Sequence, residues 1–212
     1  MGVAERRQRE FLRRERDILD AALSLFNSDR WQSVTVEQIA EKAEIGKGTV
    51  YKHFSSKDEI YARLAVDFYR MQMKSLQQID TRLDVIARLR AVVRRIWDAH
   101  MDHPVEHRLL QFVQRADFSH LLTPGVRKEL DDISQDLENL YLDLLREGVE
   151  ERVIADVPLP VLLRGASAAM TGATTILYRQ RFDGETAAEY IEQISDFIVA
   201  GVTARQRQSD ER

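Results

Sequence analysis

Hydrogen-bonding side chains gather in a short segment between positions 47 and 57. Lysine and histidine can bond to guanine edges or phosphates, threonine can contact a thymine methyl group, and tyrosine can donate its hydroxyl to a phosphate. A glycine among them would let a ligand approach the backbone closely, at a cost in helix stability of about 1 kcal/mol relative to alanine. The segment therefore predicts a surface that contacts duplex DNA. Its candidate residues are Lys47, Gly48, Thr49, Tyr51, Lys52, His53 and Lys57.

Two short helices are expected to position these side chains. Thr35 and Gln38 have the spacing of a capping box, which predicts a helix over 36–43. A three-residue turn at 44–46 leads into a second helix over 47–54, anchored by Val50 and Phe54. Two short helices joined in this way are typical of a helix-turn-helix. Lys57 begins the following helix, whose free N–H groups attract anions.

Charge is distributed unevenly along the chain. The net charge is -4, yet residues 1–16 hold six arginines against three glutamates, and residues 42–57 hold four lysines against one glutamate. Each segment therefore carries a local charge of +3. The arginine-rich start has two interpretations: an arm that enters a minor groove, or a solvated helical turn with a Glu10–Arg14 pair.

The rest of the chain has helical spacing of apolar residues, which predicts an all-α protein of about nine helices. We expect an N-terminal three-helix domain over 1–56 and a larger antiparallel helical domain over 57–212. Gly148 is the expected stop of a helix that begins near Pro124. The other long helices are expected over 9–28, 57–78, 81–103, 105–116, 158–178 and 185–205.

Several classes of protein are disfavoured by what the sequence lacks. It holds no cysteine, which excludes disulfides, cysteine-based zinc sites and a cysteine nucleophile. No apolar run is long enough to span a membrane, so we expect no membrane partner and a cytoplasmic location. The sequence contains none of the nucleophile-elbow, phosphate-loop or zinc-protease motifs, which argues against an enzyme.

The stretch AALSLFNSDRWQSVTVEQIAEKAEIGKGTVYKHFSSKDEIY resembles the DNA-binding domain of TetR-family regulators, over about 14–64. The resemblance implies a homodimer that places two helix-turn-helix heads on a palindromic operator. It implies that Lys47, Gly48 and Thr49 approach bases, and that Lys52 and His53 contact bases or phosphates. Tyr51 and Lys57 would hold phosphates, and Thr35 would cap its helix near the DNA backbone. Two positions depart from the family pattern: Glu44 and Arg30 replace glycines.

The resemblance also implies that the C-terminal helices bind a small-molecule effector, and no cofactor is expected. The mix of aromatic and methionine residues indicates an apolar or amphipathic ligand, with an acidic group if Arg115 points inward. The alternative for each residue is ordinary core packing. The candidate pocket residues are Trp97, Met101, Gln111, Phe112, Arg115, Tyr141, Met170 and Tyr178.

Three histidines have a spacing that could suit zinc. His100, His103 and His107 are separated by three and four residues, but Pro104 interrupts their shared helical face. We therefore expect these histidines either to lie on the surface or to support neighbouring side chains, and predict no metal site.

Small residues on the helix over 158–178 would let another helix approach closely. Together with the apolar face of the last helix, they predict a dimer interface, whereas packing within one chain is the alternative. The interface candidates are Gly165, Ala169, Gly172, Ile194, Phe197 and Ile198.

These patterns together predict a one-component transcriptional regulator, in which effector binding releases a repressor from DNA. Two alternatives remain. One is a helical adaptor whose head no longer binds DNA, and the other is a helical enzyme that uses the three histidines to bind metal.

Overall fold

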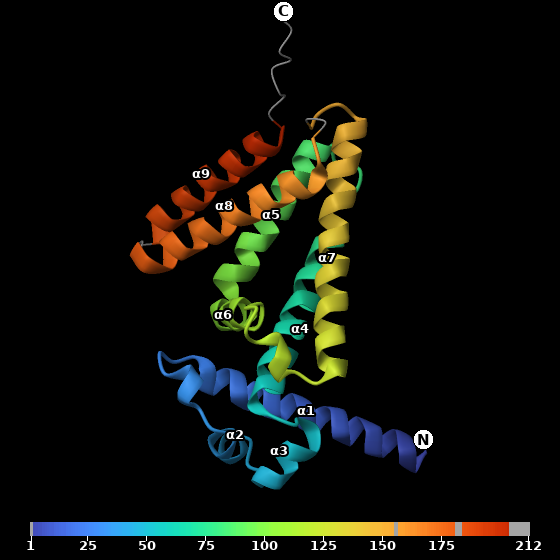
Figure 1. The fold of residues 1–212 in the computed structure, drawn as a ribbon, viewed down its shortest axis with the longest axis vertical. Helices are drawn as coiled ribbons and strands as arrows, with labels where there is room; N and C mark the ends of the chain where they lie inside the picture. The colour runs from blue at the N-terminus through green and yellow to red at the C-terminus, as the bar shows by residue number, and fades with distance from the viewer. Residues whose placement is uncertain (1, 155–156, 181–183, 204–212) are drawn as a thin grey trace, which may run out of the picture. The chain divides into compact units, whose positions relative to one another are not determined.

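The structure is a computed structural model that describes residues 2–154, 157–180 and 184–203. Over this part of the chain it contains α-helices and two short 3-10 helices, with no strand, so the all-α prediction is confirmed (Figure 1). In chain order the elements are α1 (Val3–Phe26), η1 (Trp31–Ser33), α2 (Val36–Lys42), α3 (Lys47–His53), α4 (Lys57–Leu76), α5 (Val85–Asp102), α6 (Pro104–Val113), η2 (Ser119–Leu121), α7 (Pro124–Glu150), α8 (Leu159–Gln180) and α9 (Gly184–Thr203).

Packing divides the chain into two units. The first contains residues up to Met71 together with Asp102–Ile133, and the second contains Gln72–Met101 together with the residues from Ser134 onward. The boundaries fall inside α4 and α7 and at the end of α5, so continuous helix connects the units. This division by packing differs from the expected boundary after residue 56. That boundary separated a DNA-binding domain from an effector-binding domain, and it stays a prediction.

An aromatic cluster forms the centre of the first unit. The ring centroids of Phe26 and Tyr61 lie 4.9 Å apart, those of Trp31 and Phe112 lie 5.1 Å apart, and Phe118 lies 5.1 Å from Phe112. The Trp31–Phe112 and Phe112–Phe118 pairs are edge-to-face, and pairs of that kind add about 0.5–1.5 kcal/mol each beyond their apolar burial. The core under the helix-turn-helix therefore includes side chains from α6 and the segment after it.

The second unit has its own apolar core between α5, α8 and α9. Trp97 is almost completely buried there. It packs with a cluster that includes Val93, Met170, Leu177 and Ile191. Helices α8 and α9 lie side by side over this core (Figure 1). None of the described helices is long and apolar enough to cross a membrane.

Several predicted helix boundaries were wrong. Helix α1 begins at Val3 instead of near Arg9, and α5 begins at Val85 instead of near Thr81. Helix α6 ends at Val113 instead of near Ala116, and α7 continues past Gly148 to Glu150. A Cβ atom at Gly148 would lie 2.4 Å from Ile154 Cδ1 and 3.0 Å from Val85 Cγ1, so this glycine permits close packing and does not end the helix. The expected end of the last helix, near Arg205, falls outside the described residues.

Candidate nucleic-acid interface

The predicted capping box at the start of α2 is confirmed. The backbone N–H of Gln38 donates to Thr35 Oγ1 at 3.2 Å, and the Gln38 side-chain oxygen accepts from the Thr35 N–H at 2.8 Å. Two backbone donors that a helix start would leave unpaired are thereby satisfied. The box fixes where α2 begins and therefore how α3 is presented.

The turn between α2 and α3 is built without a glycine at its left-handed position. Glu44 has a φ of 55°, the Glu44 N–H donates to the Glu41 carbonyl at 3.0 Å, and the Ile45 N–H donates to the Ala40 carbonyl at 2.9 Å. These two bonds form a Schellman motif, which normally has glycine at the position of Glu44. The turn is therefore regular, and its departure from the family pattern has a conformational cost of about 1–2 kcal/mol.

Helix α3 has one face that is anchored and one that is open to solvent. Val50 is buried, while the side chains of Thr49 and His53 are half-buried. The exposed residues are Lys47, Gly48, Tyr51 and Lys52, whose spacing of one, four and five places them on a single helical face. Four of the predicted contact residues thus share a solvent-facing surface.

Gly48 has no packing reason to be glycine. A Cβ atom built at this position would meet no atom within 4 Å. Because glycine weakens a helix interior, its presence on the open face is consistent with close approach of another molecule.

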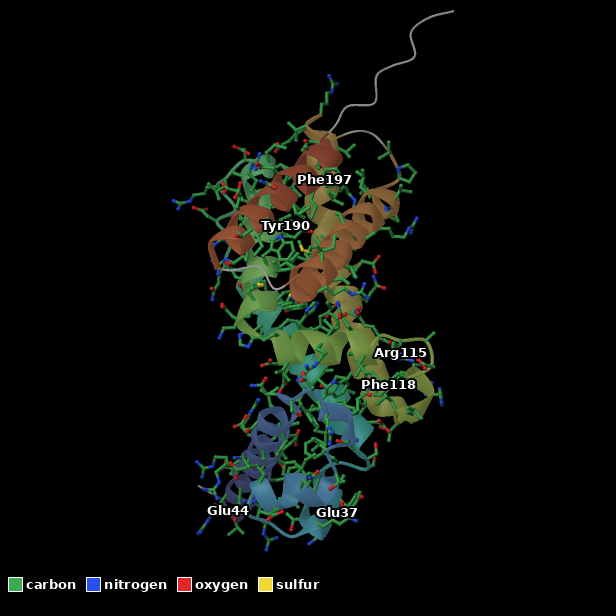
Figure 2. All side chains as sticks on the ribbon, turned by 90° about the vertical axis from the view of Figure 1, so that its left-hand side faces the viewer. Glu37, Glu44, Arg115, Phe118, Tyr190 and Phe197 are labelled. Atoms are coloured by element: carbon green, nitrogen blue, oxygen red, sulfur yellow. The ribbon has the colours of Figure 1, made fainter. Side chains whose placement is uncertain are left out.

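Lys47 is held by a residue that the sequence analysis did not identify. Its ammonium group forms an ion pair and hydrogen bond with Glu37 of α2, and it lies 5.7 Å from the centre of the Tyr51 ring. The hydrogen bond with Lys47 lowers the pKa of Glu37, and the same bond raises the pKa of Lys47. The partners are ten residues apart across the turn, so no helical spacing could have indicated the pair. Figure 2 shows Glu37 and Glu44 at opposite ends of α2.

The ammonium group of Lys57 is directed into the first unit. It donates to the carbonyl oxygens of Gln32 at 2.6 Å and Val34 at 3.0 Å, and it lies 5.5 Å from the Tyr61 ring centre. Burial lowers the pKa of Lys57. Lys57 therefore joins α4 to the segment before α2, and its expected phosphate contact stays a prediction.

His53 packs against α1. Its ring centroid lies 4.1 Å from that of Phe11, and burial lowers the pKa of the imidazole. At neutral pH the ring is therefore uncharged and contributes no positive charge to a phosphate-binding surface. Its expected contact with bases or phosphates remains a prediction.

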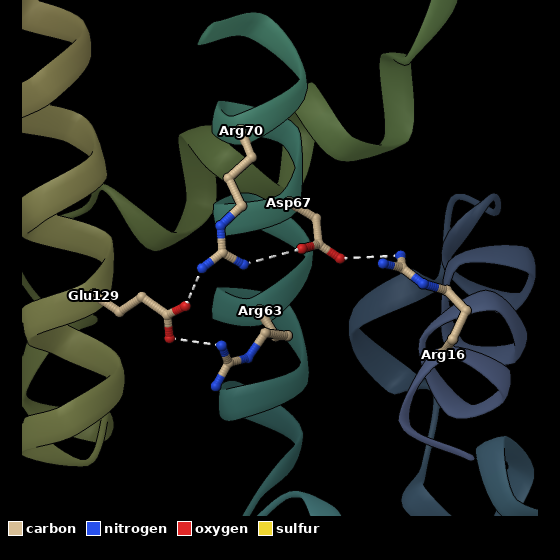
Figure 3. A network of polar contacts seen from close by, with 5 residues as sticks. All are labelled: Arg16, Arg63, Asp67, Arg70 and Glu129. Atoms are coloured by element: carbon tan, nitrogen blue, oxygen red, sulfur yellow. Dashed lines mark hydrogen bonds and ion pairs between the residues drawn. The ribbon is translucent and has the colours of Figure 1, made fainter. Parts of the chain in front are cut away.

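A chain of ion pairs connects three helices of the first unit (Figure 3). Glu129 of α7 accepts from Arg63 at 2.6 Å and from Arg70 at 2.5 Å, both on α4. Asp67, also on α4, pairs with Arg70 at 3.5 Å and with Arg16 of α1 at 3.1 Å. The network therefore links the beginning of α7 to the helix that supports α2 and α3.

The predicted pocket residues are divided between the two packing units, and their expected ligand contacts stay predictions. Phe112 contributes to the aromatic cluster of the first unit, while Gln111 is exposed. Arg115 is also exposed and pairs with Asp117 at 2.7 Å, so it does not point inward as the acidic-ligand hypothesis required.

The remaining pocket candidates lie in the second unit. Trp97 and Met170 are in its apolar core, and Tyr141 is half-buried. Met101 is 40% exposed, and the Tyr178 hydroxyl donates to the His100 carbonyl at 3.0 Å.

The described residues contain no group of three side chains placed to hold a metal ion. His103 Nδ1 lies 3.2 Å from Glu106 Oε1, and His107 is buried beside Phe68. His100 and His107 are both buried, so of the two roles expected for the histidines the surface role is wrong for these two.

The predicted dimer residues divide into two groups. Gly165, Gly172 and Phe197 face solvent, and Phe197 is 66% exposed on α9 (Figure 2). Ile198 is buried in the core of its own chain, and Ala169 and Ile194 pack against that core. The first group is therefore exposed, Ala169 and Ile194 are partly exposed, and the expected dimer contacts stay a prediction.

Sequence comparisons agree with this geometry. A family model described as bacterial regulatory proteins of the tetR family matches residues 18–64. The HTH-type transcriptional repressor KstR2 of Mycobacterium tuberculosis is 26% identical over 140 residues, which are 65% of this chain and 68% of that protein. The HTH-type transcriptional regulator TcmR of Streptomyces glaucescens is 30% identical over 154 residues, which are 68% of this chain and 65% of that protein.

Solved structures with the same fold include two bacterial regulators. The TetR-family regulator PfmR of Thermus thermophilus has a TM-score of 0.69 at 19% identity, with 87% of this chain and 97% of that chain covered. The KstR2 structure from Mycobacterium tuberculosis has a TM-score of 0.65 at 20% identity, with 90% and 95% covered.

Proposed function

This chain belongs to the tetR family of bacterial regulatory proteins, and from that membership we propose how it acts. It is a DNA-binding transcriptional regulator and not an enzyme. We propose that it is a cytoplasmic homodimeric repressor whose two α3 helices read a palindromic operator. A small-molecule effector in the second unit releases it from DNA, and no cofactor takes part.

The open face of α3 carries this proposal. Lys47, Gly48, Tyr51 and Lys52 are exposed together, and Gly48 leaves room for a close backbone approach. An α-helix fits the major groove, where lysine can bond to guanine and tyrosine to a phosphate. Thr49 lies at the edge of this face, and Thr35 lies at the exposed start of α2.

A palindromic operator requires two heads related by two-fold symmetry. The exposed residues Gly165, Gly172 and Phe197 support a symmetric interface through α8 and α9. A Cβ atom at Gly165 or Gly172 would meet nothing within 4 Å, so each glycine leaves room for a partner helix.

The effector is proposed to be apolar or amphipathic. The second unit provides an apolar core around Trp97 and Met170, with the Tyr178 hydroxyl as a polar group near it. The related KstR2 protein is named a ketosteroid transcriptional regulator, which agrees with an apolar ligand class. An effector that favours another position of α4 or α7 would act on α1 through Glu129, Asp67 and Arg16.

Duplex selection tests the proposal. The purified protein is incubated with random duplex DNA, the bound fraction is sequenced, and the affinity for the selected duplex is compared with that for a scrambled one. We expect a palindromic consensus with half-sites about one helical turn apart. A protein that enriches no sequence would instead be a helical adaptor.

The variant Gly48→Ala separates a DNA contact from a structural role. Because its Cβ would meet no protein atom, the variant should fold with a free energy of unfolding equal to or about 1 kcal/mol above that of the wild type. It should bind the selected duplex at least about tenfold more weakly, which corresponds to 1.4 kcal/mol. As a control, Gly125→Ala in α7 is equally unobstructed and should leave DNA binding unchanged. Equal affinity of Gly48→Ala and wild type would contradict the assigned face.

A further inference from the structure

The first part of α1 is a helix whose side chains stand in solvent. Every residue from Gly2 to Arg13 is exposed, and the helix over 3–13 is about 16 Å long. An isolated helix of this length would be marginal in water. Here it continues a packed helix, and the Gly2 N–H donates to Glu5 at 2.9 Å, so its start is capped.

Three of the four arginines in this part of α1 form no ion pair within the described chain. Among the described residues, Arg6, Arg7 and Arg13 have no ion pair or side-chain hydrogen bond. By contrast, every arginine of α4, α5 and α6 bonds to a partner within the chain; those residues are Arg63, Arg70, Arg88, Arg90, Arg94, Arg95 and Arg108. Arg6 and Arg13 are seven residues apart and lie on one side of the helix, and Arg7 lies about 100° around it from Arg6. Unpaired guanidinium groups on an exposed helix attract anions.

A ring contact fixes this helix beside the proposed DNA-reading element. Phe11 packs on His53, which lies in the last turn of α3. Arg7 precedes Phe11 by four residues and therefore lies on the same side of α1. Figure 1 shows α1 continuing past α3 towards the N-terminus. Arg6 and Arg7 are thereby carried beyond the end of α3, whereas Arg13 follows Phe11 by two residues and lies beside that end.

We propose that residues 3–13 are a second DNA-contact element, which binds backbone phosphates flanking the half-site that α3 reads. The inference rests on the proposed function, because it presupposes that α3 lies on DNA. A helix is about 10–12 Å across and the minor groove is about 6 Å wide, so a helical segment contacts the phosphates and does not enter that groove. Of the two interpretations of the arginine-rich start, the structure therefore favours a helical segment over an arm that enters the minor groove. Its contacts add affinity without adding sequence preference.

The test is the salt dependence of binding by the triple variant R6Q/R7Q/R13Q. Glutamine forms helix about as well as arginine and the three sites are exposed, so the fold is retained. Loss of three phosphate contacts per protomer should reduce the slope of log K against log salt by about 3 per head. The ratio of affinities for the selected and scrambled duplexes should stay the same.

A matched control is R82Q/R94Q/R146Q. These three arginines are exposed and lie in the second unit, so the control removes the same charge without touching α1. It should keep the wild-type slope. If the control loses as much slope as the α1 variant, or if the α1 variant keeps the wild-type slope, the inference is overturned.

Shortening the DNA provides an independent measurement. Trimming the selected duplex to its two half-sites should weaken the wild type by at least about tenfold and leave the triple variant unchanged, because its flanking contacts are already gone. Equal weakening of both proteins overturns the inference while the proposed function stands. A wild type that selects no duplex contradicts both proposals.

Discussion

At the scale of single residues, three of the predicted DNA-contact residues already have contacts within the chain. Lys47 pairs with Glu37, Lys57 donates to two carbonyl oxygens, and His53 is uncharged against Phe11. An ion pair between exposed side chains contributes little to stability, so Lys47 can exchange Glu37 for a phosphate or base at little cost. Lys57 would have to give up two carbonyl contacts to do the same. Lys47 and Lys52 are therefore the lysines best placed to contact DNA.

His107 predicts a specific loss of stability in acid. Burial lowers its pKa to about 4, whereas in the unfolded chain its pKa is about 6.5. The unfolded state therefore binds a proton first as pH falls, and about 3 kcal/mol of unfolding free energy should be lost between pH 6.5 and pH 4. Chemical denaturation at a series of pH values between 6.5 and 4 measures this loss of unfolding free energy. The variant His107→Leu should remove that part of the pH dependence.

Acidic residues also titrate in this range, so the relevant quantity is the difference between the wild-type and variant profiles. His120 has an exposed side chain, and His120→Leu serves as a control for replacing a histidine by leucine outside the core. Parallel profiles for wild type and His107→Leu would rule out this role for His107.

At the scale of elements, the position of α3 depends on a turn that carries conformational strain. Glu44 adopts a left-handed backbone conformation that favours glycine. Among the described residues, one other non-glycine residue has a left-handed backbone conformation. It is Arg152, which ends α7 in the same kind of motif. Both helices therefore end through backbone hydrogen bonds that outweigh the strain.

Replacing Glu44 by glycine should stabilise the protein by about 1 kcal/mol, because the left-handed strain disappears while some chain entropy is lost. For a chain of this size, that corresponds to a rise in Tm of about 2–4 °C. Glu44→Gln removes the charge but keeps the strain, so it should melt like the wild type. If Glu44→Gln is as stable as Glu44→Gly, the gain in stability comes from removing the negative charge and not from relieving the backbone strain.

At the scale of the whole molecule, the proposed dimer is argued from the apolar surface of α8 and α9. Phe197 is 66% exposed, and Val161 on α8 is 53% exposed. In a symmetric interface each copy contributes the same residue, so one substitution affects the contact twice.

The variant Phe197→Glu should raise the dimer dissociation constant at least about 30-fold, which corresponds to about 2 kcal/mol. Light scattering after size exclusion measures the change, and affinity for a two-half-site duplex should fall with it. Leu121→Glu is a matched control, since Leu121 is 48% exposed in the first unit. A Phe197→Glu protein that stays dimeric would place the interface elsewhere.

Local features of the fold could be predicted from the sequence, whereas contacts between distant segments could not. The Thr35–Gln38 box and the open face of α3 depend on spacings of one to five residues. The roles of Lys57 and Glu37 depend on the angle of the turn and on partners ten or more residues away. Gly148 has the residue type of a helix stop, but its neighbours Ile154 and Val85 are known only from the packing.

The aromatic cluster has a practical consequence for making hybrid regulators. Phe112 of α6 packs on Trp31, and Arg108 donates to the Phe26 carbonyl at 2.5 Å. A graft that moves only residues 1–56 onto a foreign effector domain would remove the α6 side chains that contact Trp31 and Phe26. Aromatic surface of the head would then be exposed to water. A transplanted head should therefore bring residues 102–133 with it, even though they come from a distant part of the gene.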